Sequence, residues 1–207
     1  MKSFEEIKLN DNIKIHKSVF DWKYSKEVLI NKVKQNLSHI GLDDTTTSIF
    51  HIQSEEINYV KEYCRNLAIN ILGYSSENIS NWVEQHWIYA SDSRTNITNS
   101  QAPIYHDHVL TLTTSSKKPI NSIKTDISYC FYLNVPTDLK GEDGKLMFKD
   151  KLGNEVGILP QTGDIIFFNP TYIHKPNFIH SSRQERIVIC SNLTINLREY
   201  GDSKTLL

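Results

Sequence analysis

Two histidines stand two residues apart in the segment His106-Asp107-His108, and a third, His174, follows an apolar stretch that begins after Gly163. In an extended strand the side chains of residues i and i+2 point to the same face, so His106 and His108 are expected to converge while Asp107 points away. Imidazole is a favoured ligand of Zn, Fe, Cu and Ni, and three protein ligands with open positions are typical of a catalytic metal site. The three histidines are therefore the predicted metal ligands.

An arginine adds a second chemical element. Arg186 stands directly before the run Ile-Val-Ile-Cys at 187–190, which predicts a buried strand. A guanidinium presents a planar fork that matches a carboxylate. A histidine pair, a distant histidine and a strand-borne arginine thus indicate a metal enzyme that also holds an acidic co-substrate. An H-x-H pair alone is a weak signal, and His86, in a strand with mixed faces, is interpreted as a hydrogen-bonded structural residue.

The elements that must position these residues are strands. Helical spacing predicts helices over 25–38 and 54–72, the second capped by Ser54 and stopped by Gly73. Alternation predicts an edge strand over 12–20 and, from Asn81 onward, several short strands separated by turns, at 81–90, 127–135, 145–148, 156–159, 165–174 and 186–196. Polar loops are expected at 91–103 and 112–126. The order predicts a mainly β sandwich or barrel with a helical buttress.

Bulk properties narrow the function classes. The 207 residues predict one domain, 1–207, in which an N-terminal strand and supporting helices (1–80) precede a β core (81–197). The net charge of -1 gives no electrostatic reason to expect nucleic-acid binding. No leader pattern and no apolar run near the ~20 residues needed to span a bilayer are present, so a cytoplasmic protein without a membrane partner is expected. The oligomeric state is unknown from sequence. Cys64, Cys130 and Cys190 are expected to be reduced, the last two as small core residues.

From about Trp82 to Asn196 the chain resembles the Fe(II)/2-oxoglutarate-dependent dioxygenases, prolyl-hydroxylase-like members in particular, whose core is a double-stranded β-helix of jelly-roll or cupin-like form. The resemblance is closest to a branch of bacteria and phages that carries H-x-H where most members carry H-x-D. It rests on the following series: His106-x-His108, Ile127-Ser128-Tyr129-Cys130-Phe131-Tyr132-Leu133-Asn134, Gly144-Lys145-Leu146-Met147-Phe148, Pro160-x-x-Gly163-Asp164, His174 and Glu185-Arg186-Ile187-Val188-Ile189.

The resemblance implies residue roles. His106 and His174 match the two ligand histidines of the family, and His108 stands where the ligand carboxylate usually lies. Arg186 matches the basic residue that pairs with the distal carboxylate of 2-oxoglutarate, and Tyr132 matches a tyrosine that helps to hold it. Arg183 is a rival for the arginine role, but it lies in a turn, whereas Arg186 leads directly into a strand.

The same resemblance implies an activity and its cofactors. The expected activity is that of an Fe(II)- and 2-oxoglutarate-dependent oxygenase, a hydroxylase that uses O2, releases succinate and CO2, and acts on a small molecule or peptide. The histidine in place of a carboxylate removes one negative charge from around the metal. Two alternatives therefore stay open: a three-histidine metalloenzyme of another class, such as a zinc lyase or hydrolase or a dioxygenase without 2-oxoglutarate, and a non-catalytic binding module. Asp107 replaces His108 as a ligand only if the strand is bulged.

Overall fold

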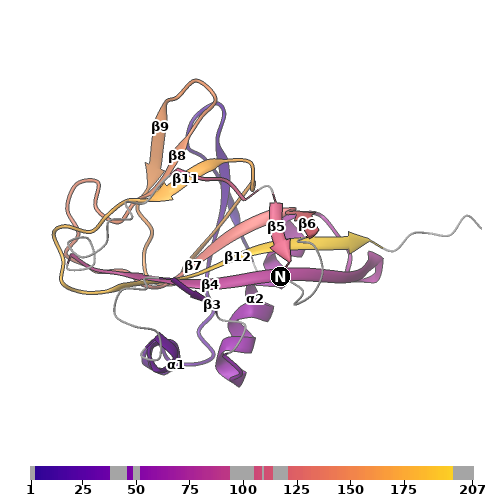
Figure 1. Cartoon of the computed structure of the whole chain (residues 1–207), viewed down its shortest axis with the longest axis horizontal. Coiled ribbons are helices and arrows are strands. Elements are labelled where there is room, and N and C mark those ends of the chain that lie inside the picture. The colour runs from indigo at the N-terminus through magenta and orange to yellow at the C-terminus, as the bar shows by residue number, and fades with distance from the viewer. Residues whose placement is uncertain are drawn as a thin grey trace, which may run out of the picture.

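The long strands of the chain form one large antiparallel sheet. The computed structural model describes residues 3–37, 46–48, 52–93, 105–108, 110–113 and 121–197. The strands β4, β7 and β12 run side by side across the molecule (Figure 1). The order in the sheet is β1 (Glu5–Lys8), β2 (Lys14–Val19), β10 (Asp164–Phe168), β7 (Ile127–Asn134), β12 (Arg186–Leu197), β4 (Ile79–Ser91) and β3 (Thr46–Ser48).

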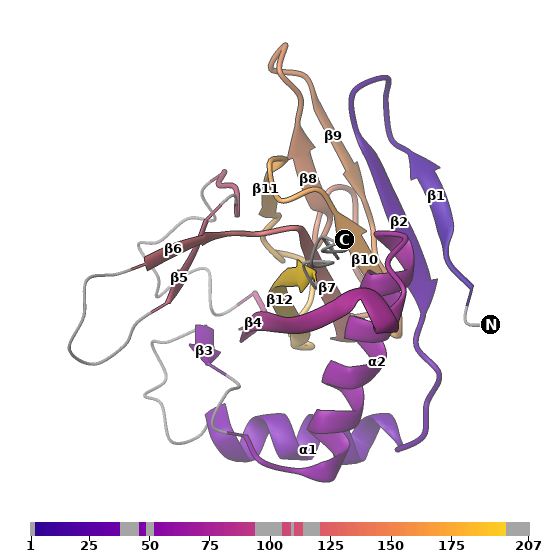
Figure 2. The same ribbon diagram turned by 90° about the vertical axis from the view of Figure 1, so that its right-hand side faces the viewer.

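A smaller antiparallel sheet lies over one face of the large sheet (Figures 1 and 2). Its order is β11 (Ile173–Pro176), β8 (Leu146–Lys149) and β9 (Glu155–Ile158), and a separate pair is formed by β5 (Leu110–Thr113) and β6 (Asn121–Lys124). Side chains of both sheets meet in one buried cluster that includes Tyr132, Phe168 and Val188 of the large sheet and Leu146 and Phe148 of the small one. Two facing sheets around a shared core confirm the predicted jelly-roll arrangement with a mainly β fold.

The two faces of the large sheet have different partners, as β12 illustrates. Val188 and Cys190 point into the core between the sheets, whereas Ile187 and Ile189 point to the opposite side and pack with the helices. Since side chains alternate along a strand, Arg186 lies on the same face as Val188. The alternation of side chains along β12 therefore places the arginine on the inner face, toward the small sheet.

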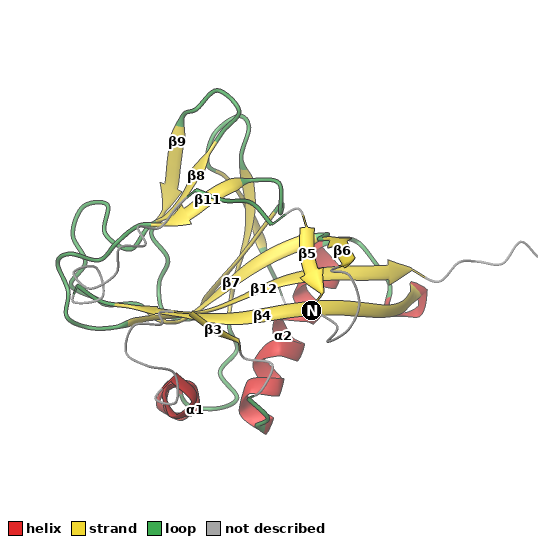
Figure 3. Cartoon of the chain, viewed as in Figure 1, coloured by secondary structure: helices red, strands yellow, loops and turns green. Residues whose placement is uncertain are grey.

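Helices α1 (Lys26–Leu37) and α2 (Glu55–Ile71) cover the outer face of the large sheet, on the side away from the small sheet (Figure 3). The oxygen of the Ser54 side chain accepts a hydrogen bond from the backbone nitrogen of Ile57 at 3.2 Å, which caps α2 as predicted. A short 3-10 helix, η2 (Ser76–Asn78), connects α2 to β4. The predicted helical buttress is confirmed. Neither helix in the described part of the chain is long and apolar enough to cross a bilayer.

The N-terminal strand differs from the prediction. The segment 12–20 was expected at a sheet edge, but β2 pairs with β1 on one side and with β10 on the other. The edge is formed by β1, a short and mostly exposed strand, Glu-Glu-Ile-Lys, that has little apolar alternation to reveal it. The expected loop at 112–126 instead holds the end of β5 and all of β6. Residues 94–104, most of the other expected loop, lie outside the described residues.

A buried polar group lies between α2 and the sheet. His86 is buried, and its Nε2 lies 3.1 Å from the hydroxyl oxygen of Tyr129. Beside it, Arg65 donates a hydrogen bond to Glu84 at 3.1 Å. Burial, followed by the charges of Lys61 and Arg65, lowers the pKa of His86 to about 3. His86 is therefore a neutral structural residue at neutral pH, as interpreted from the sequence, and it faces away from the small sheet.

This histidine is expected to make the protein sensitive to acid. In the unfolded chain His86 takes up a proton near its ordinary pKa of 6.5, whereas in the folded chain it does so only near pH 3. Its contribution to stability is complete above pH 6.5 and is lost as the pH falls toward 3, by up to about 1.4 kcal/mol per pH unit. The free energy of unfolding of the metal-free His86→Gln variant, measured with urea, should fall less steeply than that of the wild type between pH 6.5 and 4. Parallel curves would contradict the assignment.

Candidate metal centre

The segment 105–108 lies beside the start of β11. The backbone nitrogen of His106 donates to the carbonyl oxygen of His174 at 3.0 Å, and the nitrogen of His174 donates to the oxygen of His106 at 2.8 Å. The nitrogen of His108 donates to the oxygen of Pro170 at 2.9 Å. This single antiparallel bridge holds the segment extended, although it is not part of a regular strand. His106 and His108 are consequently directed to the same side, as their spacing predicted.

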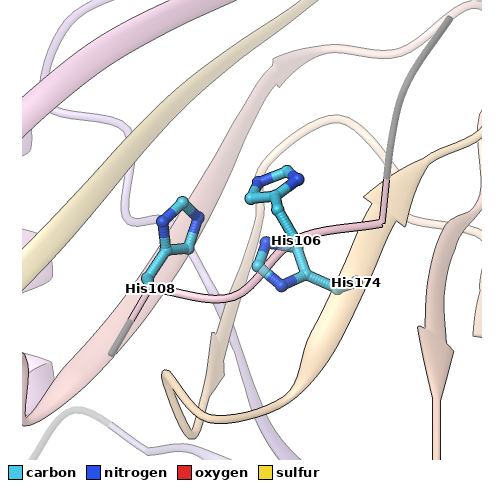
Figure 4. A group of neighbouring side chains, drawn as sticks. All are labelled: His106, His108 and His174. Carbon is cyan, nitrogen blue, oxygen red and sulfur yellow. The ribbon is translucent and has the colours of Figure 1, made fainter. Parts of the chain in front are cut away.

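The three imidazoles form one compact group (Figure 4). Ring centroids lie 4.9 Å apart for His106 and His108, 4.6 Å for His106 and His174, and 4.9 Å for His108 and His174. One ring nitrogen from each residue lies within 4.8 Å of the others. A metal about 2.1 Å from each nitrogen requires separations of about 3 Å, which small rotations of the side chains supply. The group is thus an arrangement able to hold a metal ion.

The orientation of His174 is set by its surroundings. Its Nδ1 lies 2.9 Å from the carbonyl oxygen of Tyr172, so Nδ1–H donates there and Nε2 is left with its lone pair. The ring is buried and lies against Phe168, at 4.6 Å between centroids, and Phe148, at 6.1 Å. The buried strand β10 and the small sheet therefore fix the ring in the form that coordinates metals.

Burial and the neighbouring imidazoles keep two of these rings neutral. Burial first, then the adjacent His174 and His106, lower the pKa of His108 to about 3. Burial is also the main reason that the pKa of His174 falls to about 4, although its hydrogen bond to Tyr172 acts in the opposite direction. Metals bind neutral imidazole, so His108 and His174 are in their ligand form at neutral pH without prior loss of a proton.

Asp107 lies outside the histidine group. Its side chain is exposed, and the group of metal-binding side chains found in the described part of the chain contains the three histidines and no carboxylate. His86 is also absent from that group, since it lies on the other face of the large sheet. The geometry gives no support for the bulged strand that an Asp107 ligand requires.

Arg186 is completely buried on the inner face, at 1% exposure. Its Nη1 donates to the carbonyl oxygen of Gly144 at 3.0 Å and its Nη2 donates to the hydroxyl of Ser91 at 3.3 Å. Its Nε is buried with no hydrogen-bond partner, and among the described residues no ion pair of the guanidinium with a carboxylate is found. A buried positive charge without a counter-ion is costly to the fold. This arginine is therefore a candidate for binding an anion.

Tyr132 lies near the arginine on the same face. It is opposite Val188, the second residue after Arg186, and it is buried. Burial raises the pKa of its phenol well above the ordinary value, while the charge of Arg186 acts to lower it. The phenol is therefore neutral and retains its proton as a hydrogen-bond donor. Arg183, the rival arginine, is exposed.

Sequence reasoning missed several neighbours of these groups. Trp87 lies against His108, with ring centroids 5.2 Å apart. Ser91 and Gly144 hold the guanidinium of Arg186, and neither belongs to a motif that marks such a role. Ser91 pairs with Arg186 across β4 and β12, so only the register of the two strands reveals it.

The fold is found among solved structures. The chain is similar to a prolyl-4-hydroxylase of Pseudomonas putida (12% identity, 87% of this chain and 92% of that chain, TM-score 0.51). It is also similar to the non-heme alpha ketoglutarate dependent epimerase SnoN from nogalamycin biosynthesis (12%, 87% and 77%, TM-score 0.57). The chain therefore has the same fold as these two proteins, a double-stranded β-helix. A further similar structure is HygX from Streptomyces hygroscopicus with nickel and 2-oxoglutarate bound (9%, 86% and 81%, TM-score 0.52).

These likenesses confirm the predicted fold class. At sequence identities of 9–12%, the similarity shows a shared fold and not a shared activity. No family model matches the sequence, and no curated protein matches it. The expected relationship to the H-x-H branch of bacteria and phages therefore stays a prediction.

Proposed function

We propose that this protein is an Fe(II)- and 2-oxoglutarate-dependent oxygenase in which His106, His108 and His174 hold the metal and Arg186 and Tyr132 hold the distal carboxylate of 2-oxoglutarate. One observation carries the proposal: a fully buried arginine without a carboxylate partner in the described chain lies on the inner face of the large sheet, and the group of three histidines lies on the same side of that sheet, against Trp87 and Phe168. A buried guanidinium binds a carboxylate well, and imidazoles bind a metal ion. A compound with a metal-chelating keto acid at one end and a second carboxylate at the other satisfies both.

The spacing along the sheet supports this assignment. Trp87, which contacts His108, is opposite Cys190, and Cys190 lies four residues after Arg186 on β12. Four residues of strand correspond to about 13 Å. An arginine side chain and a five-carbon dicarboxylate laid end to end bridge a distance of that order. The Nε of Arg186, which has no partner, and the phenol of Tyr132 are available as further donors.

The reaction follows from the bound groups, and the chain positions them. Fe(II) and 2-oxoglutarate, when bound, would supply the oxidative chemistry. O2 is reduced, 2-oxoglutarate is decarboxylated to succinate and CO2, and a C–H bond of the substrate is oxidised, with hydroxylation as the expected outcome. The histidines hold the metal, and the Tyr172 carbonyl fixes the orientation of His174. The apolar side chains around them, Trp87, Phe148 and Phe168, exclude water from one side of the centre.

The charge of the site also matters for substrate and metal. Three neutral imidazoles, Fe(II) and a 2-oxoglutarate dianion sum to zero, whereas a carboxylate ligand would make the sum negative. The net charge of -1 for the whole chain offers no attraction for nucleic acid. We therefore propose a small molecule or a peptide as the substrate.

An anaerobic titration of the Fe(II)-loaded protein with 2-oxoglutarate tests the proposal. Chelation of the metal by the keto acid is expected to produce a visible charge-transfer band, and the ligand at ~100 times its Kd should add about 2.7 kcal/mol to the free energy of unfolding. Succinate is the control, because it has both carboxylates and no keto group; it should produce no band. Bound iron with neither band nor stabilisation would refute the proposed function.

A second candidate function follows from the ligand set itself. Three neutral histidines are also the ligands of catalytic zinc in carbonic-anhydrase-type sites. In that case the protein binds close to one Zn(II) per chain. Addition of 2-oxoglutarate then changes neither the visible spectrum of the Co(II)-substituted protein nor the melting temperature of the Zn(II)-loaded protein. The titration above separates the two functions.

A further inference from the structure

Two cysteines face each other across the central strands of the large sheet. Cys130 of β7 and Cys190 of β12 are directly opposite in the register, and the Sγ–H of Cys130 donates to Sγ of Cys190 at 3.6 Å. Both side chains point into the core between the sheets and keep 7% and 8% exposure. The sequence predicted reduced core cysteines, but not that they are neighbours.

The backbone geometry is already compatible with a disulfide. Opposed residues in antiparallel strands have Cα atoms about 4.5–5.5 Å apart, within the range of roughly 4.4–6.8 Å that disulfides require. The sulfurs must approach by about 1.5 Å, from 3.6 Å to the ~2.05 Å of the bond, which is within reach of side-chain rotation.

The pair lies between the two halves of the proposed site. Cys130 is two residues from Tyr132 on the same face of β7, and Cys190 is opposite Trp87, which contacts His108. Arg186 is on the same face, four residues before Cys190. Movement of the two sulfurs therefore changes the packing of the core side chains that lie between the histidines and Arg186.

We propose that Cys130 and Cys190 are a redox modification site, which hydrogen peroxide converts to a disulfide, and that this disulfide weakens the binding of 2-oxoglutarate. The reaction balances as two thiols and one peroxide giving one S–S bond and two waters: the sulfurs are oxidised, the peroxide oxygens are reduced, and both thiol hydrogens leave in water. The second half of the proposal rests on the proposed function, whereas the first does not.

The surroundings predict a slow and reversible reaction. The hydrogen bond with Cys130, together with burial, raises the pKa of the Cys190 thiol, so little thiolate forms at neutral pH. Oxidation should therefore accelerate as the pH rises. The disulfide, once formed, is reduced again by thiol–disulfide exchange with an added dithiol.

Cys64 provides a matched control. It is the third cysteine, it is fully buried in α2, and it packs on the helical side of the large sheet. The strand pair therefore differs from it in having an opposed partner and a position between the two sheets.

The first test needs no ligand. Metal-free protein is treated with hydrogen peroxide, unfolded, alkylated and analysed by mass spectrometry, before and after dithiothreitol. The expected result is the loss of two hydrogens, one cross-linked peptide pair containing Cys130 and Cys190, and full reversal by the reductant. Cys64→Ser should behave as the wild type, and Cys130→Ser should form no cross-link. A Cys64 cross-link, or sulfinic acid without a disulfide, overturns the proposal.

The second test measures 2-oxoglutarate binding to Ni(II)-loaded protein by calorimetry. The oxidised wild type should bind about tenfold more weakly than the reduced form, and Cys130→Ser should show no change after peroxide. Equal affinity of both forms, or the same loss in Cys130→Ser, overturns the regulatory half. If reduced wild type does not bind 2-oxoglutarate at all, the proposed function and the regulatory half both fall, while the mass measurement still decides the disulfide.

Discussion

Replacing Arg186 with alanine is expected to abolish 2-oxoglutarate binding while the protein retains its metal. Removal of one partner of a buried, hydrogen-bonded charge pair costs about 2–5 kcal/mol, a factor of roughly 30 to several thousand in Kd. The three histidines lie on other elements, the 105–108 segment and β11, so their geometry does not depend on the guanidinium. Calorimetry with Ni(II)-loaded protein measures both quantities, first the metal and then 2-oxoglutarate.

Two further variants make this result specific. Arg183→Ala removes an exposed positive charge three residues away and should leave the 2-oxoglutarate affinity unchanged. Arg186→Lys keeps the charge but not the planar fork, so an intermediate loss is expected. If Arg183→Ala abolishes binding and Arg186→Ala does not, the assignment of the anchoring arginine is wrong.

Stability in the absence of ligand adds an independent readout. In the described chain the Arg186 guanidinium is held by a carbonyl and a hydroxyl and has no counter-ion, so its burial is unfavourable. If Arg186 served mainly to stabilise the fold, its replacement would lower the free energy of unfolding substantially. If Arg186 instead serves to bind an anion, its replacement should lower the free energy of unfolding by much less than it weakens the binding of 2-oxoglutarate. The Arg186→Met variant, which refills the volume, should differ from the wild type by no more than about 1 kcal/mol in the free energy of unfolding.

Local patterns predicted the inner face well. The i, i+2 rule placed His106 and His108 together, and it succeeded without a regular strand because the backbone bridge to His174 keeps the segment extended. Arg186 was preferred to Arg183 because it leads directly into an apolar strand whereas Arg183 lies in a turn, and the structure buries the first residue and exposes the second. The first inference depends on backbone period and the second on the local character of strand and turn, and a sequence expresses both directly.

Long-range register was beyond these patterns. The pairing of β2 with both β1 and β10, the contact of Arg186 with Ser91, and the opposition of Cys130 and Cys190 each depend on which residues of two distant strands lie side by side. Register follows from turn geometry and from packing of the whole sheet, not from the composition of one strand. That His174 joins the histidine pair was predicted from the residue types and implied again by the family resemblance, but no local pattern shows that the two segments lie side by side.

The His108→Ala variant is expected to weaken metal binding by more than about 100-fold, whereas Asp107→Ala should change it by less than about threefold. Loss of residues that merely orient ligands typically costs 10- to 100-fold, so loss of a ligand should exceed that range. His108 contributes a ring to the compact group, and the pKa of about 3 shows that burial keeps it neutral and ready to coordinate. Asp107 is exposed and lies outside the group. Competition of Ni(II) with a chromophoric chelator measures each affinity.

The matched variant His108→Asp tests the charge argument at the same position. It places a carboxylate where most members of the resembled family carry one, so metal binding should be retained, and the site with Fe(II) and 2-oxoglutarate changes from net neutral to net negative. A negative site stabilises the higher oxidation state of iron, so the Fe(III)/Fe(II) potential of this variant should lie below that of the wild type in anaerobic voltammetry. A larger loss of metal in Asp107→Ala than in His108→Ala would instead show that the carboxylate is the ligand and that His108 lines the pocket.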